Sequence, residues 1–215
     1  YPRHREIMAL FSRPLLTTAY FPPVEYFMVL ASAPEVWLEA CENYQKQSYR
    51  TRCHIYASAG REVLQVPVCH GAGTISEVEI DYSREWLHQH KVALLSAYRS
   101  SPFFEYYWDE IKVVLDSRPR FLFELNTLLT ETLLNLLNIR CNLRLTEEYV
   151  KEWQGEDFRS TIHPKSKEVS LLEKYSMQKP YYQIFGQRAG FIPNLSILDL
   201  LFHEGPQATD YLVKR

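Results

Sequence analysis

Two consecutive prolines, Pro22 and Pro23, constrain the fold of this chain more than any other feature of its sequence. The preceding residues, 15–21, read LLTTAYF, a composition typical of a β-strand. A strand cannot continue through the pair because proline lacks an N–H donor and fixes φ, whereas proline is tolerated in the first turn of a helix. We therefore expect a strand at 15–21, a rigid aromatic elbow, and a helix over 25–33. In an α/β sheet such an elbow lies at the carboxyl end of a strand, where ligands bind; the alternative is an ordinary proline-stiffened loop.

The remaining pattern predicts a mixed α/β fold. An apolar strand at 36–40 completes a strand–helix–strand unit, which predicts two parallel neighbours. Residues 49–57 alternate with a period of two, and together with 63–68 and 75–81 they predict a three-stranded antiparallel meander. The second half is predicted to be mainly helical, with segments at about 83–99, from 102 to the break at Arg118-Pro119, at 121–137 and at 194–202, and with one strand near 143–145. The whole should contain six or more strands and at least five helices.

The 215 residues suit a single domain spanning 1–215. Residues 1–12 are expected to be a flexible or non-native N-terminal extension. Residues 151–180 are polar and are interrupted by Gly155, Pro164 and Pro180, which predicts a long excursion or lid.

Composition excludes several classes of protein. The formal net charge is −2 with dispersed basic residues, so no nucleic-acid footprint is expected. No segment approaches the ~20 apolar residues of a membrane span, and the opening YPRHREIMAL lacks the apolar core of a signal peptide. The 4 cysteines lack zinc-site spacing. We therefore expect a cytoplasmic protein with reduced thiols and no metal site, and the sequence leaves cofactor and oligomeric state open.

The best charge cluster consists of Lys46, Arg50 and Arg52. The alternation of residues 49–57 places Arg50, Arg52 and His54 on one face of a strand, with Lys46 just before it. Paired guanidinium groups at this spacing can hold a phosphate or carboxylate. We expect these side chains to open into the main cleft beside Tyr20 or Phe21; the alternative is a solvated face paired with surface glutamates.

Two further polar residues lie on apolar helix faces. His90 shares a face with Trp86 and Ala97 and could accept a proton if that face lines a cleft, although a hydrogen-bonded core histidine is the alternative. Asp199 lies on a short apolar helix and needs a partner, either an arginine or a backbone amide. We expect His90 and Asp199 to converge on the arginine cleft. The nucleophile and phosphate motifs GxSxG, Walker A, GxGxxG and HExxH are absent.

Four sequence blocks carry a family resemblance. They are YFPPVEYF at 20–27, YQKQSYRTRCHI at 44–55, WLHQHKVALLSAYRSSPFF at 86–104 and FIPNLSILDLLFHEG at 191–205. In this order they resemble the WbqC-like protein family over roughly residues 13–205. The resemblance implies association with bacterial polysaccharide and O-antigen genes, and a glycyl (aminoacyl) transferase role has been suggested for the founding type.

The resemblance also bears on single residues. Lys46, Tyr49 and Arg52 match a family block in which Thr51 departs from the more usual Asn, while His90, Asn194 and Asp199 match without departure. We take His90, Lys46 and Asp199 as candidate catalytic residues. The candidate substrate-binding residues are Tyr20, Phe21, Glu25, Arg50, Arg52, Tyr98, Tyr182, Gln183 and Asn194. For Asn194 the alternative is a structural cap of the last helix.

The resulting hypothesis is a transferase that passes an acyl or aminoacyl group to an amino sugar in surface polysaccharide assembly. His90 would accept the proton of the amine, and Lys46, Arg50 and Arg52 would hold developing negative charge. The expected partner is a small molecule or sugar nucleotide, with no nucleic acid except an aminoacyl donor. One alternative is a nucleotide-dependent ligase or nucleotidyltransferase, although Glu25 and Tyr26 replace the His and Gly of a HIGH-type turn. The other is a non-catalytic binding protein.

Overall fold

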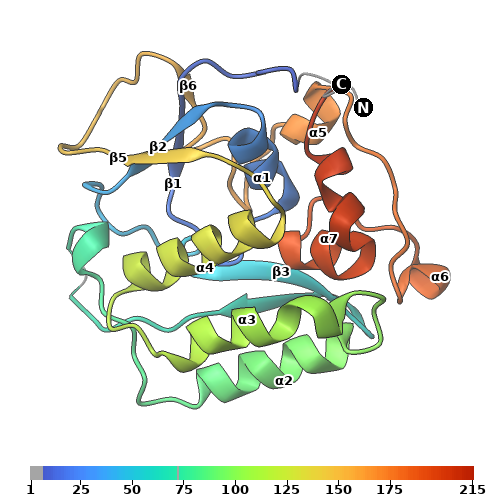
Figure 1. Ribbon diagram of the computed structural model, residues 1–215. Helices are drawn as coiled ribbons and strands as arrows, with labels where there is room; N and C mark the ends of the chain where they lie inside the picture. The colour runs from blue at the N-terminus through green and yellow to red at the C-terminus, as the bar shows by residue number, and fades with distance from the viewer. Residues whose placement is uncertain (1–6, 72) are drawn as a thin grey trace.

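The computed structural model describes residues 7–71 and 73–215, and this part of the chain forms a mixed α/β fold (Figure 1). The described residues contain six strands and seven α-helices, as expected. The strands are β1 (Pro14–Thr17), β2 (Glu35–Glu39), β3 (Arg52–Ala57), β4 (Gly60–Gln65), β5 (Asn142–Leu145) and β6 (Glu156–Asp157). The helices are α1 (Val24–Ala31), α2 (Trp86–Tyr98), α3 (Phe104–Asp116), α4 (Leu122–Leu136), α5 (Leu171–Lys174), α6 (Gly186–Ala189) and α7 (Ile197–Glu204), with 3₁₀ helices η1 (Ile75–Glu77) and η2 (Gly205–Tyr211).

The parallel sheet has the strand order β5-β2-β1-β6. β1 and β2 are parallel neighbours joined through α1, which confirms the predicted βαβ unit. β1 is shorter than the expected strand at 15–21 because the chain leaves the sheet after Thr17: the Tyr20 N–H bonds to the Tyr49 carbonyl and Phe21 has a φ of 39°. The elbow therefore begins before the two prolines, at the carboxyl edge of the sheet.

The two faces of this sheet differ in chemistry. One face carries Leu16, Val36 and Leu38, which are buried, and α1 lies against this sheet (Figure 1). Because side chains alternate along a strand, the registered residues Trp37 and Arg144 lie on the opposite face. The chain following β5 lies over that face, where Trp153 contacts Trp37. The helix-covered face supplies the core, and the polar face supplies grooves.

The predicted three-stranded meander is wrong in its third strand. β3 and β4 form a two-stranded antiparallel hairpin. Residues 75–77 form η1, and beyond it pairing is limited to isolated bridges such as the one between Val68 and Ile80. Pro67 explains part of this loss, because it lacks the N–H that a continuing ladder needs, and only its carbonyl is used, by the Asp81 N–H.

The helices expected in the second half are present as α2, α3, α4 and α7. Figure 1 shows α2 and α3 beside the hairpin, with α4 between them and the parallel sheet. The burial of α4 follows a helical repeat through Leu122, Leu125, Leu129 and Leu133. None of the helices among the described residues is long and apolar enough to cross a membrane.

The chain at 151–180 is attached to the sheet by β6, which pairs with β1. Phe158, Ile162 and Leu171 of this segment are buried, while its movement as a lid stays a prediction. At the other end of the chain, residues 1–6 of the expected N-terminal extension lie outside the described residues. Phe11, within that expected extension, is buried against Phe158 and Tyr175.

Asn194 does not cap the last helix. Ser196 is the N-cap of α7, where its Oγ accepts a hydrogen bond from the Leu198 N–H. Asn194 instead accepts at Oδ1 from the Glu25 N–H, in the first turn of α1, over 3.0 Å. The chain between Pro193 and Ser196 passes close to the proline elbow, so the nearest unsatisfied helix N–H belongs to α1.

Candidate functional site

His90 is a buried histidine with both ring nitrogens engaged. It is 5% exposed; Nε2 donates to the Gln65 carbonyl over 3.1 Å, and Nδ1 accepts from the Tyr20 hydroxyl over 2.8 Å. Because the Gln65 carbonyl oxygen can only accept, His90 carries its proton on Nε2. Burial lowers the pKa of His90 to about 4, against a weaker opposing effect of the Gln65 carbonyl. The imidazole is therefore neutral and internally satisfied at neutral pH.

Asp199 is a fully buried carboxylate held by neutral donors. Its oxygens accept from Tyr98 Oη at 3.0 Å, Tyr181 Oη at 2.5 Å and Gln183 Nε2 at 2.8 Å. Neighbouring His203 accepts at Nε2 from the Ile184 N–H and donates from Nδ1 to the Asp199 carbonyl. Burial first, and then the Asp199 charge, raises the pKa of both tyrosines well above the ordinary range. The expectation that an arginine or a backbone amide binds the Asp199 carboxylate is therefore wrong.

His90 and Asp199 do not converge on one cleft. Tyr98, which binds Asp199, lies on the same helix as His90. At a rise of about 1.5 Å per residue, His90 and Tyr98 are about 12 Å apart along the axis of α2. Each polar group is satisfied within its own neighbourhood. The structure thus brings Tyr98, Gln183 and Asp199 together, and separately joins Tyr20 to His90.

The expected arginine face is also divided. Arg50 is 2% exposed and grips the Glu42 carboxylate with two hydrogen bonds of 2.7 Å, while Arg52 Nε donates to Gln65 Oε1 over 3.0 Å. The alternation was extended too far: β3 begins at Arg52, so Arg50 lies in the preceding turn and faces another direction. His54 is buried, and burial first, then Arg61 and Arg52, lowers its pKa to about 4. Arg50 and His54 are buried, as are Tyr20 and Phe21, so these side chains do not present an open anion-binding face.

The remaining predicted substrate residues are dispersed. Tyr20 and Phe21 are fully buried, whereas Tyr182 is 52% exposed. Glu25 is buried and accepts from the Leu171 N–H over 2.9 Å, and burial raises the pKa of its carboxyl. Through Leu171 and Asn194, Glu25 links α1 to two distant parts of the chain. These contacts join separate parts of the chain, and Asn194 also lines a small cavity beside Val24 and Tyr181.

Polar groups gather instead at the carboxyl edge of the parallel sheet. Glu39, the last residue of β2, is fully buried, and its Oε1 accepts from the Cys41 N–H at 2.9 Å and from Thr146 Oγ1 at 2.8 Å. Its Oε2 lies 3.3 Å from Arg159 Nη1. Arg159 also binds the carboxylate of Asp157, at the end of β6, over 2.8 Å. Glu39 and Arg159 therefore tie the ends of three parallel strands together.

A cleft of about 450 Å³ opens beside these groups, and we call it the strand-end cleft. It is lined by Glu42, Tyr149, Asp157, Arg159, His163 and Lys165, among others. Glu42 connects it to the buried Arg50, because the same carboxylate forms the Arg50 ion pair. The position agrees with the general placement of ligands outside the carboxyl ends of strands in open α/β sheets.

The charges of the cleft are set by its neighbours. Burial would raise the pKa of Asp157, but the hydrogen bonds and charge of Arg159 outweigh it and lower that pKa. Burial first, and then the charges of Arg50 and Lys165, lowers the pKa of His163. His163 Nδ1 accepts from the Lys165 N–H over 3.1 Å, so Nε2 carries the proton of the neutral ring. The cleft thus offers two cations, an imidazole N–H donor and two carboxylates.

Lys46 borders this cleft. It is exposed and stands between Gln45, which lines the cleft, and Gln47, which hydrogen-bonds to Lys165. Among the predicted residues, Lys46 is thus the chain neighbour of one lining residue, and Arg50 is the ion-pair partner of another. Glu39, Glu42, Arg159 and His163 were missed. Glu39 lies near the end of the strand predicted at 36–40 and Glu42 follows that strand, so both could have been found from their position. Arg159 and His163 come from a segment with no local signal.

The fold and the cleft define an α/β protein with a polar cleft at the carboxyl edge of a parallel sheet. The chain belongs to the WbqC-like protein family, whose model matches residues 18–168 and 166–211. An uncharacterized protein of Mycobacterium tuberculosis (strain ATCC 25618 / H37Rv), Rv1507c, is 27% identical over 229 aligned residues that cover 92% of this chain and 96% of the relative. No solved structure matches the chain. Within residues 7–71 and 73–215, no cluster of three or more His, Cys, Asp or Glu side chains is placed to hold a metal ion.

Proposed function

We propose that this protein is a cytoplasmic transferase that passes an acyl or aminoacyl group of the glycyl type to an amino sugar in surface polysaccharide biosynthesis, with the strand-end cleft as its active site. The observation that carries the proposal is the gathering of Arg159, Lys165, His163 and two carboxylates at the carboxyl edge of the sheet. Family membership adds the association with polysaccharides. The buried, internally bonded His90 and Asp199 support the fold in this proposal and take no part at the reacting atoms.

The chemistry of acyl transfer assigns roles to the cleft residues. Lys165 and the neighbouring Lys46 hold the anionic part of an activated donor, because charge-assisted hydrogen bonds are the strong ones. Arg159, whose N–H groups bind Glu39, Asp157 and the Val150 carbonyl, keeps Asp157 ionised and in position. The Nε2–H of neutral His163 donates to the carbonyl oxygen as negative charge develops on it. The acceptor amine becomes acidic as its nitrogen bonds to the carbonyl carbon, so the carboxylate of Asp157 suffices to take its proton. The activated leaving group departs when the carbonyl reforms.

The test begins with turnover. The protein is incubated with labelled glycine, ATP and a uridine-diphosphate amino sugar, and separately with acetyl-coenzyme A, and transfer of label to the sugar is measured. Lys165→Ala should lower the rate about tenfold or more, because a hydrogen bond to a charged group is worth about 1.5–3 kcal/mol. Lys167→Ala is the matched control, because Lys167 is exposed in the same segment. Equal rates in both variants would remove the strand-end cleft from the reaction.

The same assay separates the alternative functions. A nucleotide-dependent ligase or nucleotidyltransferase incorporates labelled phosphate or nucleotide in place of labelled amino acid. A non-catalytic binding protein shows a ligand-dependent rise in melting temperature, as expected from linkage, without any turnover. Either result replaces the transferase proposal with the corresponding class.

A further inference from the structure

A second groove lies on the polar face of the parallel sheet. Residues 147–150 separate it from the strand-end cleft. The second groove measures about 630 Å³ and is lined by Arg13, Trp37, Arg144 and Trp153, with Asn142 and Glu147 at its border. Tyr149 lines the strand-end cleft, whereas Glu148 and Val150 line this groove. We call it the indole groove. None of the roles proposed above uses it.

The walls of the indole groove are held in place by the backbone. Trp153 Nε1 donates to the Arg13 carbonyl over 2.8 Å, and the N–H groups of Ser12 and Arg13 both bind the Glu156 carboxylate, at 3.0 and 2.8 Å. Gly155 permits this close approach, because a Cβ atom there would lie 2.3 Å from the Arg13 carbonyl oxygen. The indole and the guanidinium are therefore fixed before any ligand arrives.

Arg13 carries a stacked guanidinium with its hydrogen-bonding edge open. Its Cζ lies 4.5 Å from the Trp153 ring centre and 5.1 Å from that of Trp37. Among residues 7–71 and 73–215, no carboxylate forms an ion pair with the Arg13 guanidinium, whereas Arg144 is held by Glu35 at 2.7 Å. A guanidinium that stacks through its face still offers its N–H edge to a planar or tetrahedral anion.

We propose that the indole groove binds a sugar ring that carries an anionic group, either a carboxylate or a phosphate. The exposed parts of the two indoles pack against the apolar C–H face of the ring, and Arg13 binds the anion. Asn142, Glu147 and Glu148 supply the oxygen acceptors that sugar hydroxyls require. The indoles are inclined by 56° with centroids 5.6 Å apart, so they do not form the parallel walls that would sandwich a nucleobase.

The experiment titrates the full-length protein with glucuronate, glucose 1-phosphate, glucose, inorganic phosphate and AMP, and follows saturation-transfer NMR and tryptophan fluorescence. Trp86 and Trp108 are buried, so a fluorescence change reports mainly on Trp37 and Trp153. Glucuronate or glucose 1-phosphate should bind saturably and at least tenfold more tightly than glucose or inorganic phosphate, and the preferred one of the two identifies the anion. The proposal is overturned if inorganic phosphate binds as tightly as the acidic sugars or if AMP binds more tightly than they do. It is also overturned if neither acidic sugar binds saturably.

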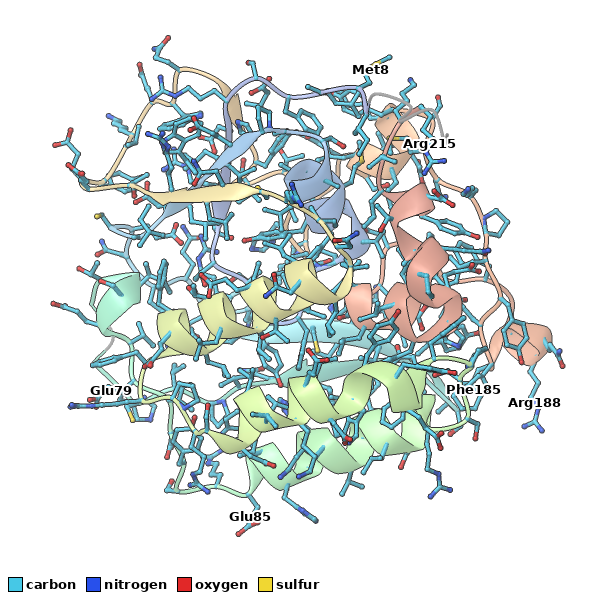
Figure 2. All side chains as sticks on the ribbon, viewed as in Figure 1. Met8, Glu79, Glu85, Phe185, Arg188 and Arg215 are labelled. Carbon is cyan, nitrogen blue, oxygen red and sulfur yellow. The ribbon has the colours of Figure 1, made fainter. Side chains whose placement is uncertain are left out.

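Variants locate the binding. Arg13→Gln removes the charge of an exposed side chain and leaves its backbone contacts intact, and it should weaken binding of the acidic sugar at least tenfold with the melting temperature nearly unchanged. Arg188→Gln is the matched control, because Arg188 projects outward from α6 (Figure 2). Lys165→Ala, in the strand-end cleft, should leave this binding unchanged, so failure of the transferase proposal and failure of this one are distinguishable. Unaltered affinity in Arg13→Gln would refute the assignment.

Discussion

At the scale of single residues, burial decides what each polar group can do. His90 and Asp199 have the sequence context of site residues, yet the polar atoms of both side chains form hydrogen bonds to partners inside the protein. Arg50 is likewise committed to Glu42, and removing one partner of such a buried pair commonly costs about 3–5 kcal/mol because the other charge is left uncompensated. The sequence identifies these residues as unusual, because each is polar in an apolar or patterned setting. It does not identify their partners, which come from distant parts of the chain.

His90 should make stability depend on pH. Its pKa is about 4 in the folded protein and about 6.5 in the unfolded chain. The unfolded state therefore binds more protons between these values, so stability is present above pH 6.5 and is lost as the pH falls toward 4. The free energy of unfolding should fall by about 2–3 kcal/mol across this window on account of His90.

The check is urea unfolding at several pH values. His90→Gln should reduce the dependence of the free energy of unfolding on pH. Part of the dependence should persist because burial also lowers the pKa of His54. His88→Gln, an exposed position on the same helix, serves as the control and should keep the slope of the parent protein. An identical slope in His90→Gln and the parent would contradict this assignment.

At the scale of elements, local signals predicted helices and strands well and their pairing partners less well. The proline elbow, the βαβ unit and the helices α2, α3 and α4 follow from nearby residues, and the structure contains them. The prediction of a third meander strand failed in part because Pro67 interrupts a ladder that hydrophobic alternation alone suggests, and in part because residues 75–77 form η1. β6 is two residues long and exists only through pairing with β1, so no periodicity could reveal it.

Gly155 allows this last strand to pair. A Cβ atom there would lie 2.3 Å from the Arg13 carbonyl oxygen and 2.9 Å from Trp153 Nε1, so Gly155→Ala should force the chain before β6 away from β1. We expect a loss of about 1–3 kcal/mol, in the range of other overpacked sites, measured as a lower urea midpoint. Gly186→Ala is the matched control, because its nearest contact would be an ordinary 3.4 Å. Equal midpoints for the two variants would show that the backbone adjusts without cost.

At the scale of the whole molecule, the polar face of the parallel sheet organises both candidate sites. The helices cover the other face, and the chain from 146 to 166 returns over the polar face, leaving the strand-end cleft on one side and the indole groove on the other. The structure divides the predicted arginine site between separate partners. Arg159 and His163, which the sequence did not reveal, reach the carboxyl edge only through long-range strand pairing. A rule based on strand ends would have selected Glu39 and Glu42 from the sequence alone.

Arg159 is the main polar anchor of this returning segment. Its guanidinium binds Glu39, Asp157 and the Val150 carbonyl, the last over 2.6 Å. Arg159→Ala should therefore release residues 147–170 while the buried β1, β2 and α1 stay folded, since local opening needs only local contacts to break. Limited trypsin digestion should then cut after Lys165 and Lys167 at least several-fold faster than in Arg188→Ala, an exposed control. Near-ultraviolet circular dichroism should keep most of its native signal. Unchanged cleavage at these lysines would show that the segment is held by its apolar contacts. Equally fast cleavage along the whole chain would show that Arg159 supports the global fold. Either result would contradict the prediction that this segment can open as a lid.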